Sequence, residues 1–386
     1  MIYSHDIRRV HFELSSRCNA KCPNCPRNVE GGYTVPTLLE TAITLEQFKK
    51  ILPPNFIKQL HLFIFCGNYG DPIFCTDLPA IAEYVYEHNK DCRINMHTNG
   101  GARNTSWWSK LAEANPNLEC TFSVDGLRDT NHIYRRGVVW EKVMSNAESF
   151  INNGGKAIWE YLLFQHNQHQ VNDAKDLAVR MGFKRYITKR AFGFEFYDNH
   201  YKSMRVVDKN GDIEYLIFEA TDENSKHQVW NKQSTDRGNY SLPSTVWNSM
   251  VKNHYRDHDE IYLQEIASQP DKPTCIDCHS FREKEIYIDA SGHIFPCCWL
   301  GHSSQVSQPA IDQVQFKKWL ERNIGMKSIN ALQRPIEEII NSDYFKLIED
   351  TWSLTDQQGK LQTCYTMCNK NQNILDNLYK KKEELV

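Results

Sequence analysis

Short apolar runs of strand length alternate with longer amphipathic stretches through the first half of this 386-residue chain. The strand-like runs are Arg8–Leu14, Leu60–Cys66, Cys92–Met96, Cys120–Val124, Ala157–Phe164 and Lys184–Lys189. Between them, apolar residues recur at helical spacing in Leu45–Leu52, Leu78–Asn89, Ser106–Ala114, Val138–Ile151 and Asn172–Met181. Strands that alternate with helices of about ten to fifteen residues predict βαβ units and a parallel sheet.

Helix-boundary signals support this division. Thr44, followed three residues later by Gln47, predicts a capping box, and Asp77 and Asn172 are the expected N-terminal caps of two later helices. Gly182 and the pair Gly154-Gly155 predict helix ends, because glycine adopts the left-handed backbone that commonly ends a helix.

The number of repeated units sets the fold class. Six units within residues 1–190 fall short of a closed eight-stranded barrel, so we predict an α/β fold with an open, TIM-like (β/α)6 partial barrel. Residues 191–271 break the rhythm: Arg205–Phe218 predicts a β-hairpin with Asn210-Gly211 as its turn pair. This stretch is a linker, a substrate-facing insertion or, as we favour, a plain surface subdomain. Residues 272–386 form a predicted small C-terminal domain that ends in a helix.

Composition narrows the class of protein. A net charge of −3 gives no electrostatic footprint for nucleic acid, and Lys380–Lys382 precede two glutamates, as in a solvated terminal helix. No apolar stretch is long enough to span a bilayer, and the N-terminus lacks a signal pattern. Thirteen cysteines without an export signal indicate a reducing compartment, by default the cytoplasm, where cysteine clusters more often bind metal than cross-link.

Three cysteines near the N-terminus carry the strongest chemical signal. Cys18, Cys22 and Cys25 form a C-x3-C-x2-C triplet directly after the first predicted strand, with no fourth cysteine nearby. A [4Fe–4S] cluster usually has four thiolate ligands, so three would leave one iron open for chemistry. The alternatives are a zinc site and unrelated thiols, but structural zinc sites usually pair one C-x2-4-C with a second pair.

The triplet and its position resemble those of the radical S-adenosylmethionine (SAM) superfamily. The resemblance implies that the open iron chelates the amino and carboxylate groups of SAM. Reductive cleavage would then release a 5′-deoxyadenosyl radical that removes a hydrogen atom from the substrate.

The resemblance extends to turns that follow the later strands. Gly67, Asn68, Tyr69, Gly70, Asp71 and Pro72 resemble the family's Gly-Gly-Glu-Pro turn, which holds the SAM amino group, although Tyr69 and Asp71 depart from it. Thr98 and Asn99 are similar to a segment that lines the same pocket. Ser123 and Asp125 are expected at the ribose hydroxyls and Arg135 at the SAM carboxylate. Relatives often have an adenine-stacking aromatic residue where this chain has Asn24, so Leu163 is an alternative adenine contact.

A second cysteine group lies near the C-terminus: Cys275, Cys278, Cys297, Cys298, Cys364 and Cys368. The spacing C-x13-G-x4-C between Cys278 and Cys297 resembles the start of the SPASM and twitch extensions of radical SAM enzymes, which carry auxiliary [4Fe–4S] clusters. We predict one auxiliary cluster on Cys278, Cys297, Cys364 and Cys368, with Cys275 and Cys298 as alternates. A four-thiolate structural zinc site is the main alternative, and zinc has no redox chemistry.

The resemblance implies a radical SAM oxidoreductase that abstracts a hydrogen atom from a peptide or small-molecule substrate. A reducing electron donor of the flavodoxin or ferredoxin type is the expected partner. The alternative is a radical SAM methyltransferase or RNA-modifying enzyme, which would usually carry extra cysteines or a basic appendage. Of the remaining cysteines, Cys92 and Cys120 are expected in the core, whereas Cys66 ends a strand where it could line the pocket.

Overall fold

The computed structural model describes residues 2–197, 201–221, 229–231, 276–302, 311–355 and 358–368. The chain divides into two compact units. The larger contains residues 11–241 and 289–291, and the smaller contains residues 1–10, 242–288 and 292–386. The predicted limit at residue 271 and the predicted C-terminal helix lie outside the described residues.

The larger unit is built on one sheet, in which the strands follow the order β12-β8-β7-β6-β5-β4-β1. The four pairs from β4 to β8 are parallel, and the short β12 lies antiparallel to β8. The strands are β1 (Arg9–Phe12), β4 (Leu62–Phe65), β5 (Arg93–Thr98), β6 (Leu118–Ser123), β7 (Lys156–Leu163), β8 (Arg185–Arg190) and β12 (Val229–Asn231). Each of the predicted strands overlaps one of these.

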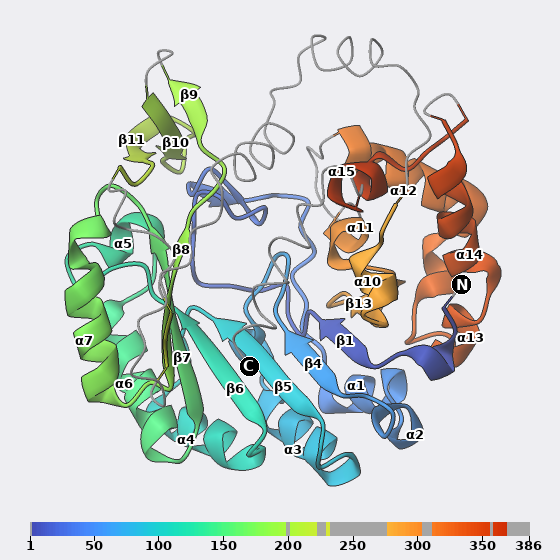
Figure 1. Cartoon of the computed structure of the whole chain (residues 1–386), viewed down its shortest axis with the longest axis horizontal. Helices are drawn as coiled ribbons and strands as arrows, with labels where there is room; N and C mark the ends of the chain where they lie inside the picture. The colour runs from blue at the N-terminus through green and yellow to red at the C-terminus, as the bar shows by residue number, and fades with distance from the viewer. Residues whose placement is uncertain are drawn as a thin grey trace. The chain divides into compact units, whose positions relative to one another are not determined.

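Helices connect successive strands and lie along the outer side of the sheet (Figure 1). They are α1 (Leu45–Ile51), α2 (Pro54–Ile57), α3 (Leu78–His88), α4 (Thr105–Ala114), α5 (Asn131–Tyr134), α6 (Trp140–Asn152) and α7 (Val171–Met181), with short 3-10 turns η2 (Pro72–Phe74) and η3 (Gln168–Gln170). This alternation confirms the predicted α/β fold, with a parallel sheet typical of a partial TIM barrel.

The helix-boundary predictions have mixed outcomes. Thr44 and Gln47 form the predicted capping box, and Gly182 ends α7 in the left-handed conformation. Asp77 precedes α3 but does not cap it, because its carboxylate accepts a hydrogen bond from the N–H of Leu45 at 2.8 Å. The prediction for Asn172 was wrong: α7 begins one residue earlier, at Val171.

Alternating burial distinguishes the two faces of the sheet. On β7, Trp159, Tyr161 and Leu163 are fully buried on the face that the helices cover, so Glu160 and Leu162 lie on the opposite, open face. Leu163 is therefore placed away from the open face on which an adenine ring could rest, contrary to the sequence-based suggestion.

A small antiparallel sheet follows β8. It consists of β9 (Glu195–Tyr197), β10 (Tyr201–Val207) and β11 (Ile213–Phe218), and β10 and β11 form the predicted hairpin. The connection is longer than a two-residue turn, however, because Val207 pairs with Ile213. Asp208 organises this loop by accepting hydrogen bonds from the N–H groups of Asn210 and Asp212 at 2.7 and 3.0 Å. A further short pair, β2 (Asn28–Val29) and β3 (Tyr33–Thr34), follows the cysteine triplet.

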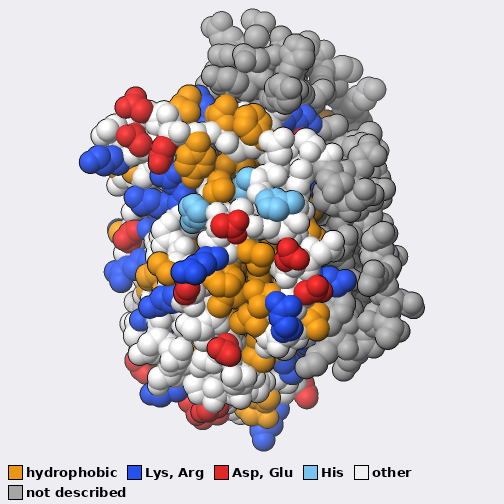
Figure 2. Space-filling view, turned by 90° about the vertical axis from the view of Figure 1, so that its left-hand side faces the viewer, with side chains coloured by type: hydrophobic (Ala, Val, Ile, Leu, Met, Phe, Trp, Pro, Cys, Tyr) orange, Lys and Arg blue, Asp and Glu red, His pale blue; other side chains and the backbone are white. Residues whose placement is uncertain are grey.

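The surface of this unit matches the near-neutral composition. Figure 2 shows acidic and basic side chains interspersed with hydrophobic and histidine side chains on the face that carries α7 and the small sheet. Within the described ranges, no helix has the length and apolar character required to cross a membrane.

The smaller unit is mainly helical. Its antiparallel pair, β13 (Glu285–Ile288) and β14 (Ile294–Phe295), is connected through Gly292, which has a φ of 84°. Its helical elements are η1 (Ser4–Asp6), α10 (His279–Arg282), α11 (Cys298–His302), α12 (Ile311–Asn323), η4 (Met326–Ile329), α13 (Ile336–Ile340), α14 (Asp343–Asp350), η5 (Thr351–Ser353) and α15 (Gln362–Cys368).

Candidate active site

The cysteine triplet lies in a loop that follows β1 and is tied to the carboxyl-terminal side of the parallel sheet. The carbonyl of Arg17 accepts a hydrogen bond from the N–H of Asp71 at 2.9 Å, just after β4. The N–H of Lys21 donates to the carbonyl of Arg136, after β6, at 2.8 Å. The loop therefore occupies the edge at which parallel α/β folds bind their ligands.

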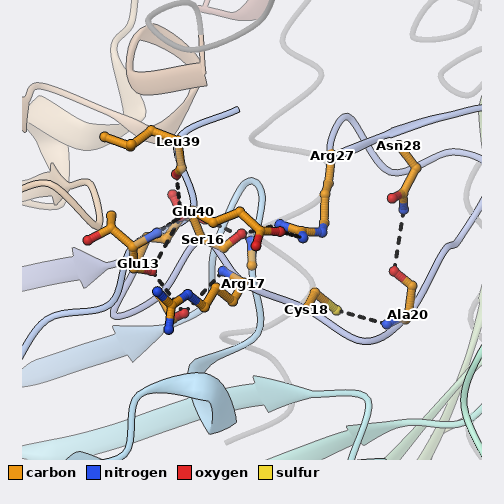
Figure 3. Close-up of polar contacts among 12 residues, drawn as sticks. Glu13, Ser16, Arg17, Cys18, Ala20, Arg27, Asn28, Leu39 and Glu40 are labelled. Carbon is orange, nitrogen blue, oxygen red and sulfur yellow. Dashed lines mark hydrogen bonds and ion pairs between the residues drawn. The ribbon is translucent and has the colours of Figure 1, made fainter. Parts of the chain in front are cut away.

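Polar contacts within the loop fix its course (Figure 3). Arg27 is almost fully buried and donates to the carbonyl of Ser16 and to the carboxylate of Glu40. The side-chain amide of Asn28 donates to the carbonyls of Ala20 and Cys22 at 3.5 and 3.4 Å. The backbone around the thiols is thus held by side chains that follow them in the sequence.

Each of the three sulfur atoms has a nearby nitrogen donor. Cys18 Sγ accepts from the N–H of Ala20 at 3.3 Å and from Nδ2 of Asn99 at 3.5 Å. Cys22 Sγ lies 3.7 Å from Nη1 of Arg135. The Arg27 N–H opposes the rise in the pKa of Cys25. Hydrogen bonds from such donors are a common means of stabilising thiolates at a metal centre.

The three thiols act on one another electrostatically. Burial raises the pKa of Cys18, and the negative charges of Asp71, Cys22 and Cys25 raise it further. Burial and the neighbouring Cys22 raise the pKa of Cys25 to about 12. A bound cation would remove this repulsion, because metals bind thiolates and displace their protons.

The three-thiol donor set suits an iron–sulfur cluster. Among the described residues, no three His, Cys, Asp or Glu side chains are arranged to hold a single metal ion. The thiolates of a [4Fe–4S] cluster bind separate irons. The three sulfur atoms therefore need not converge on one point, as the ligands of a single metal ion must.

Glu13, which sequence reasoning missed, holds the turn after β4. Its side chain is fully buried, and Oε1 accepts from the N–H groups of Tyr69 and Gly70 at 2.7 and 2.9 Å. A side chain at Gly70 would place its Cβ only 1.9 Å from the carbonyl oxygen of Ser15. The available signal was a single carboxylate within the strand-like run Val10–Leu14.

Asp71 connects this turn to β5. Its carboxylate accepts from Oγ1 of Thr98 and from the N–H of Asn99, both at 2.7 Å, and from the N–H of Ile73 at 3.2 Å. Burial raises the pKa of Asp71, and these donors oppose that rise. The structure thus gives Asp71 three protein donors, Ile73 just after it and Thr98 and Asn99 at the end of β5. Pro72, which begins η2, is buried, whereas Gly67 and Asn68 are half-buried.

Asn99 links β5 to the cysteine loop. Its Nδ2 atom donates to Oδ1 of Asn19 at 3.0 Å as well as to Cys18. Its Oδ1 accepts from the N–H of Gly101 at 2.7 Å. Asn99 therefore positions the first thiol relative to the strand end.

Arg135 connects the second thiol to β6. Its Nε donates to the fully buried carboxylate of Asp125 at 2.6 Å, and the other carboxylate oxygen accepts from the N–H of Leu162 at 2.7 Å. Burial raises the pKa of Asp125, which the Arg135 guanidinium opposes. Ser123 is half-buried and its hydroxyl makes no hydrogen bond to the part of the chain that the structure describes.

Polar side chains continue along the open face of the sheet. Glu160 on β7 and Lys189 on β8 form an ion pair at 2.5 Å, and Cys66 is half-buried after β4. Cys92 and Cys120 are fully buried, which confirms their assignment to the core. Asn24 donates to the carbonyl of Phe192 at 2.9 Å, so its side-chain amide contacts the segment after β8.

A second group of thiols meets within the smaller unit. Cys278, Cys297, Cys364 and Cys368 line one cavity together with largely apolar side chains; we call this cavity the auxiliary site. Its other lining residues are Ile276, Phe281, Pro296, Trp299, Leu300, Ile348, Trp352, Thr363 and Met367. Cys298 does not line the cavity, and Cys275 lies outside the described residues.

Local structure separates the two adjacent cysteines. Cys297 directly precedes α11, and the N–H groups of Leu300 and Trp299 in that helix oppose the rise in its pKa. Cys278 donates its thiol proton toward Cys368, which lowers the pKa of Cys368. The auxiliary site therefore brings together the four sulfurs singled out from the sequence.

Comparisons with known proteins agree with the position of the triplet. The family model of the Radical SAM superfamily matches residues 12–178, which include the cysteine loop and most of the parallel sheet. No curated protein sequence matches the chain significantly.

Solved structures with a similar course of chain have low identity. SuiB from Streptococcus suis is 12% identical with a TM-score of 0.49, and the match covers 88% of this chain and 67% of SuiB. BtrN in complex with AdoMet and 2-DOIA is 12% identical with a TM-score of 0.43, covering 93% and 91% of the two chains. anSMEcpe with bound AdoMet and Cp18Cys peptide is 14% identical with a TM-score of 0.45, covering 98% of each.

Proposed function

Because residues 12–178 match the family model of the Radical SAM superfamily, we propose that the chain is a radical SAM oxidoreductase acting on a peptide or small molecule. The observation that supports this most strongly is the group of three close thiols, Cys18, Cys22 and Cys25, at the ligand-binding edge of the sheet. Bound there, a [4Fe–4S] cluster would supply the electron that cleaves SAM to a 5′-deoxyadenosyl radical.

The chain's own residues would hold and orient this cluster. Asn99 and Arg135 donate toward Cys18 and Cys22, so each side chain stabilises one sulfur as a thiolate. Asp125 fixes the guanidinium of Arg135, and Asp71 fixes the backbone of Asn99. The two carboxylates would thus position the donors rather than bind iron.

We propose that different residues of this site contact different parts of SAM. The turn Gly67–Pro72, Thr98 and Asn99 would shape the pocket for the amino group, and the guanidinium of Arg135 suits the carboxylate. The Ser123 hydroxyl, on the open face, would bind a ribose hydroxyl. Asp125 is fully buried, so we assign it to the orientation of Arg135.

The auxiliary site would hold one further [4Fe–4S] cluster on Cys278, Cys297, Cys364 and Cys368. Four thiols lining one largely apolar cavity match the ligand count of such a cluster. It would accept an electron from the substrate radical or bind the substrate. A flavodoxin or ferredoxin type of protein in the cytoplasm would deliver the reducing electron.

Metal analysis combined with substitution tests this proposal. Anaerobically reconstituted protein should contain about eight irons per chain, four for each cluster. Replacement of Cys18, Cys22 and Cys25 by alanine should remove about four irons and abolish 5′-deoxyadenosine formation. Cys298→Ala, the matched control, should retain all the iron, because Cys298 does not line the auxiliary site.

Other outcomes would change the assignment. About four irons together with stoichiometric zinc would make the auxiliary site structural, since zinc has no redox chemistry. Tight, salt-sensitive RNA binding would favour an RNA-modifying enzyme instead. Wild-type protein that binds no iron would contradict the proposed function as a whole.

A further inference from the structure

Two buried hydrogen-bond donors near the auxiliary site have no partner other than its thiols. The indole Nε1 of Trp352 and the phenol oxygen of Tyr344 are both inaccessible to solvent. The phenol has no hydrogen-bond partner among the described residues, and the indole N–H has only the weakly accepting Cys364 thiol. Buried donors are nearly always paired in folded proteins, and an unpaired one costs about 1–3 kcal/mol. A weakly paired indole and an unpaired phenol close to one thiol-lined cavity therefore indicate a stronger acceptor that binds there.

Both donors are close to sulfur atoms of the site. Trp352 lines the cavity, and its N–H opposes the burial-driven rise in the pKa of Cys364. Tyr344 lies in the first turn of α14, one helical turn before Ile348, which lines the cavity. The charge of Cys297 adds to the burial-driven rise in the pKa of Tyr344. The two donors thus approach the cavity beside different cysteines.

The chemistry of the missing acceptor can be narrowed. Neither indole nor phenol is a usual ligand of iron or zinc, so these groups would serve the sulfurs instead. A zinc site offers only its four thiolates as acceptors, whereas an iron–sulfur cluster adds inorganic sulfides. A cluster therefore accounts more readily for two additional donors around one cavity.

We propose that Trp352 and Tyr344 donate hydrogen bonds to sulfur atoms of an iron–sulfur cluster in the auxiliary site and thereby raise its reduction potential. This inference rests on the proposed function of that site. Reduction adds one electron, and the extra negative charge is shared by the sulfurs. Because a donor is attracted more strongly to the more negative state, each hydrogen bond favours the reduced cluster.

The test measures the potential of the second cluster alone. In the full chain carrying Cys18→Ala, Cys22→Ala and Cys25→Ala, a mediated redox titration followed by electron paramagnetic resonance reports only the auxiliary site. Trp352→Phe and Tyr344→Phe are then added separately, since phenylalanine keeps most of the side-chain bulk and removes the donor. Trp319→Phe is the matched control, because Trp319 stacks on Phe316 and does not line the cavity.

We expect each donor variant to retain about four irons. The equilibrium constant for reduction of the cluster should fall by up to about tenfold, which lowers the reduction potential by about 59 mV. Trp319→Phe should leave the potential unchanged. Unchanged potentials in both donor variants, with the iron retained, would overturn the inference while leaving the auxiliary cluster in place. Loss of iron from both variants would assign the two residues to assembly and would also overturn it. Zinc in place of iron in the parent protein would instead refute the auxiliary cluster itself.

Discussion

Glu13 and Tyr69 are 56 residues apart, yet Oε1 of Glu13 accepts a hydrogen bond from the Tyr69 N–H at 2.7 Å. The same oxygen accepts from Gly70, so one buried carboxylate at the end of β1 fixes the turn that follows β4. This turn also supports the cysteine loop through the backbone contact of Asp71 with Arg17. The neighbouring strands β1 and β4 are therefore coupled at the site by a side chain that is not itself a candidate ligand.

Glu13→Ala should destabilise the turn more than Glu13→Gln does. Alanine would leave the N–H groups of Tyr69 and Gly70 without their acceptor, at about 1–3 kcal/mol for each. Glutamine retains one acceptor oxygen, but its hydrogen bonds are weaker because the amide oxygen lacks the negative charge of the carboxylate. Urea unfolding of the two variants, together with SAM binding to the iron-loaded proteins, measures both effects. Equal stabilities of the alanine and glutamine variants would contradict this role.

Gly70→Ala should be poorly tolerated because the added methyl group meets backbone. The nearest atom to its Cβ would be the Ser15 carbonyl oxygen at 1.9 Å, and no side-chain rotation relieves that overlap. We expect a loss of about 3 kcal/mol or more in unfolding free energy, with reduced iron retention.

The control for this variant is Gly154→Ala. Gly154 has a φ of 87°, and a Cβ added there would meet no atom within 4 Å, so only backbone strain of about 1–2 kcal/mol is expected. A Gly70→Ala protein as stable as this control would show that the close approach to Ser15 is not needed.

The ion pair between Asp125 and Arg135 should show strong coupling. Asp125→Asn leaves a buried guanidinium without its counter-charge and should cost about 3 kcal/mol or more. Adding Arg135→Met to the Asp125→Asn protein should lower the free energy of unfolding much less than Arg135→Met does in the wild-type protein. The reason is that the double variant has no uncompensated charge. A double-mutant cycle by urea unfolding measures this coupling, and simple additivity would argue against it.

An exposed ion pair provides the comparison. Arg128 and Glu141 are 2.5 Å apart, but their side chains are 78% and 51% exposed. Glu141→Gln should therefore change the unfolding free energy by no more than about 1 kcal/mol.

His166 should make stability depend on pH in the acidic range. Burial lowers the pKa of His166 to about 4, with His132 and His169 adding to the effect, and its ring stacks on Phe164. Because the folded-state pKa lies below the unfolded value of about 6.5, the unfolded chain binds the proton first. This contribution to stability is present above about pH 6.5 and is lost as the pH falls toward 4.

The variant His166→Asn should lose this dependence. Comparing urea unfolding at pH 7 and pH 5 for the two proteins isolates the histidine, because other titrating groups are shared. The wild-type protein should lose more stability on acidification than the variant. The same loss in both would show that His166 is not buried as a neutral ring.

The fold was predictable because the signals are local and repetitive. Alternating burial on β7 and the capping box at Thr44 are both determined by a few neighbouring residues. The misassigned cap at Asn172 shows the limit, since Val171 packs into the core and so begins the helix one residue earlier.

The sequence pointed to the site only through its cysteines. Cysteine spacing singled out the triplet and the four thiols that line the auxiliary site, with Cys298 kept as an alternate to the adjacent Cys297. The start of α11 decides this, because Cys297 precedes the helix and lines the cavity whereas Cys298 begins it. Glu13, Trp352 and Tyr344 have no motif, since their partners are distant in sequence and their roles depend on burial.

Reductive cleavage of SAM tests the central claim most directly. Protein reconstituted with iron and sulfide without oxygen should absorb broadly in the visible range, and dithionite with SAM should then yield 5′-deoxyadenosine. The Cys18→Ala, Cys22→Ala, Cys25→Ala protein, treated identically, should yield none. Intact SAM in the wild-type reaction, despite a reduced cluster, would contradict the account.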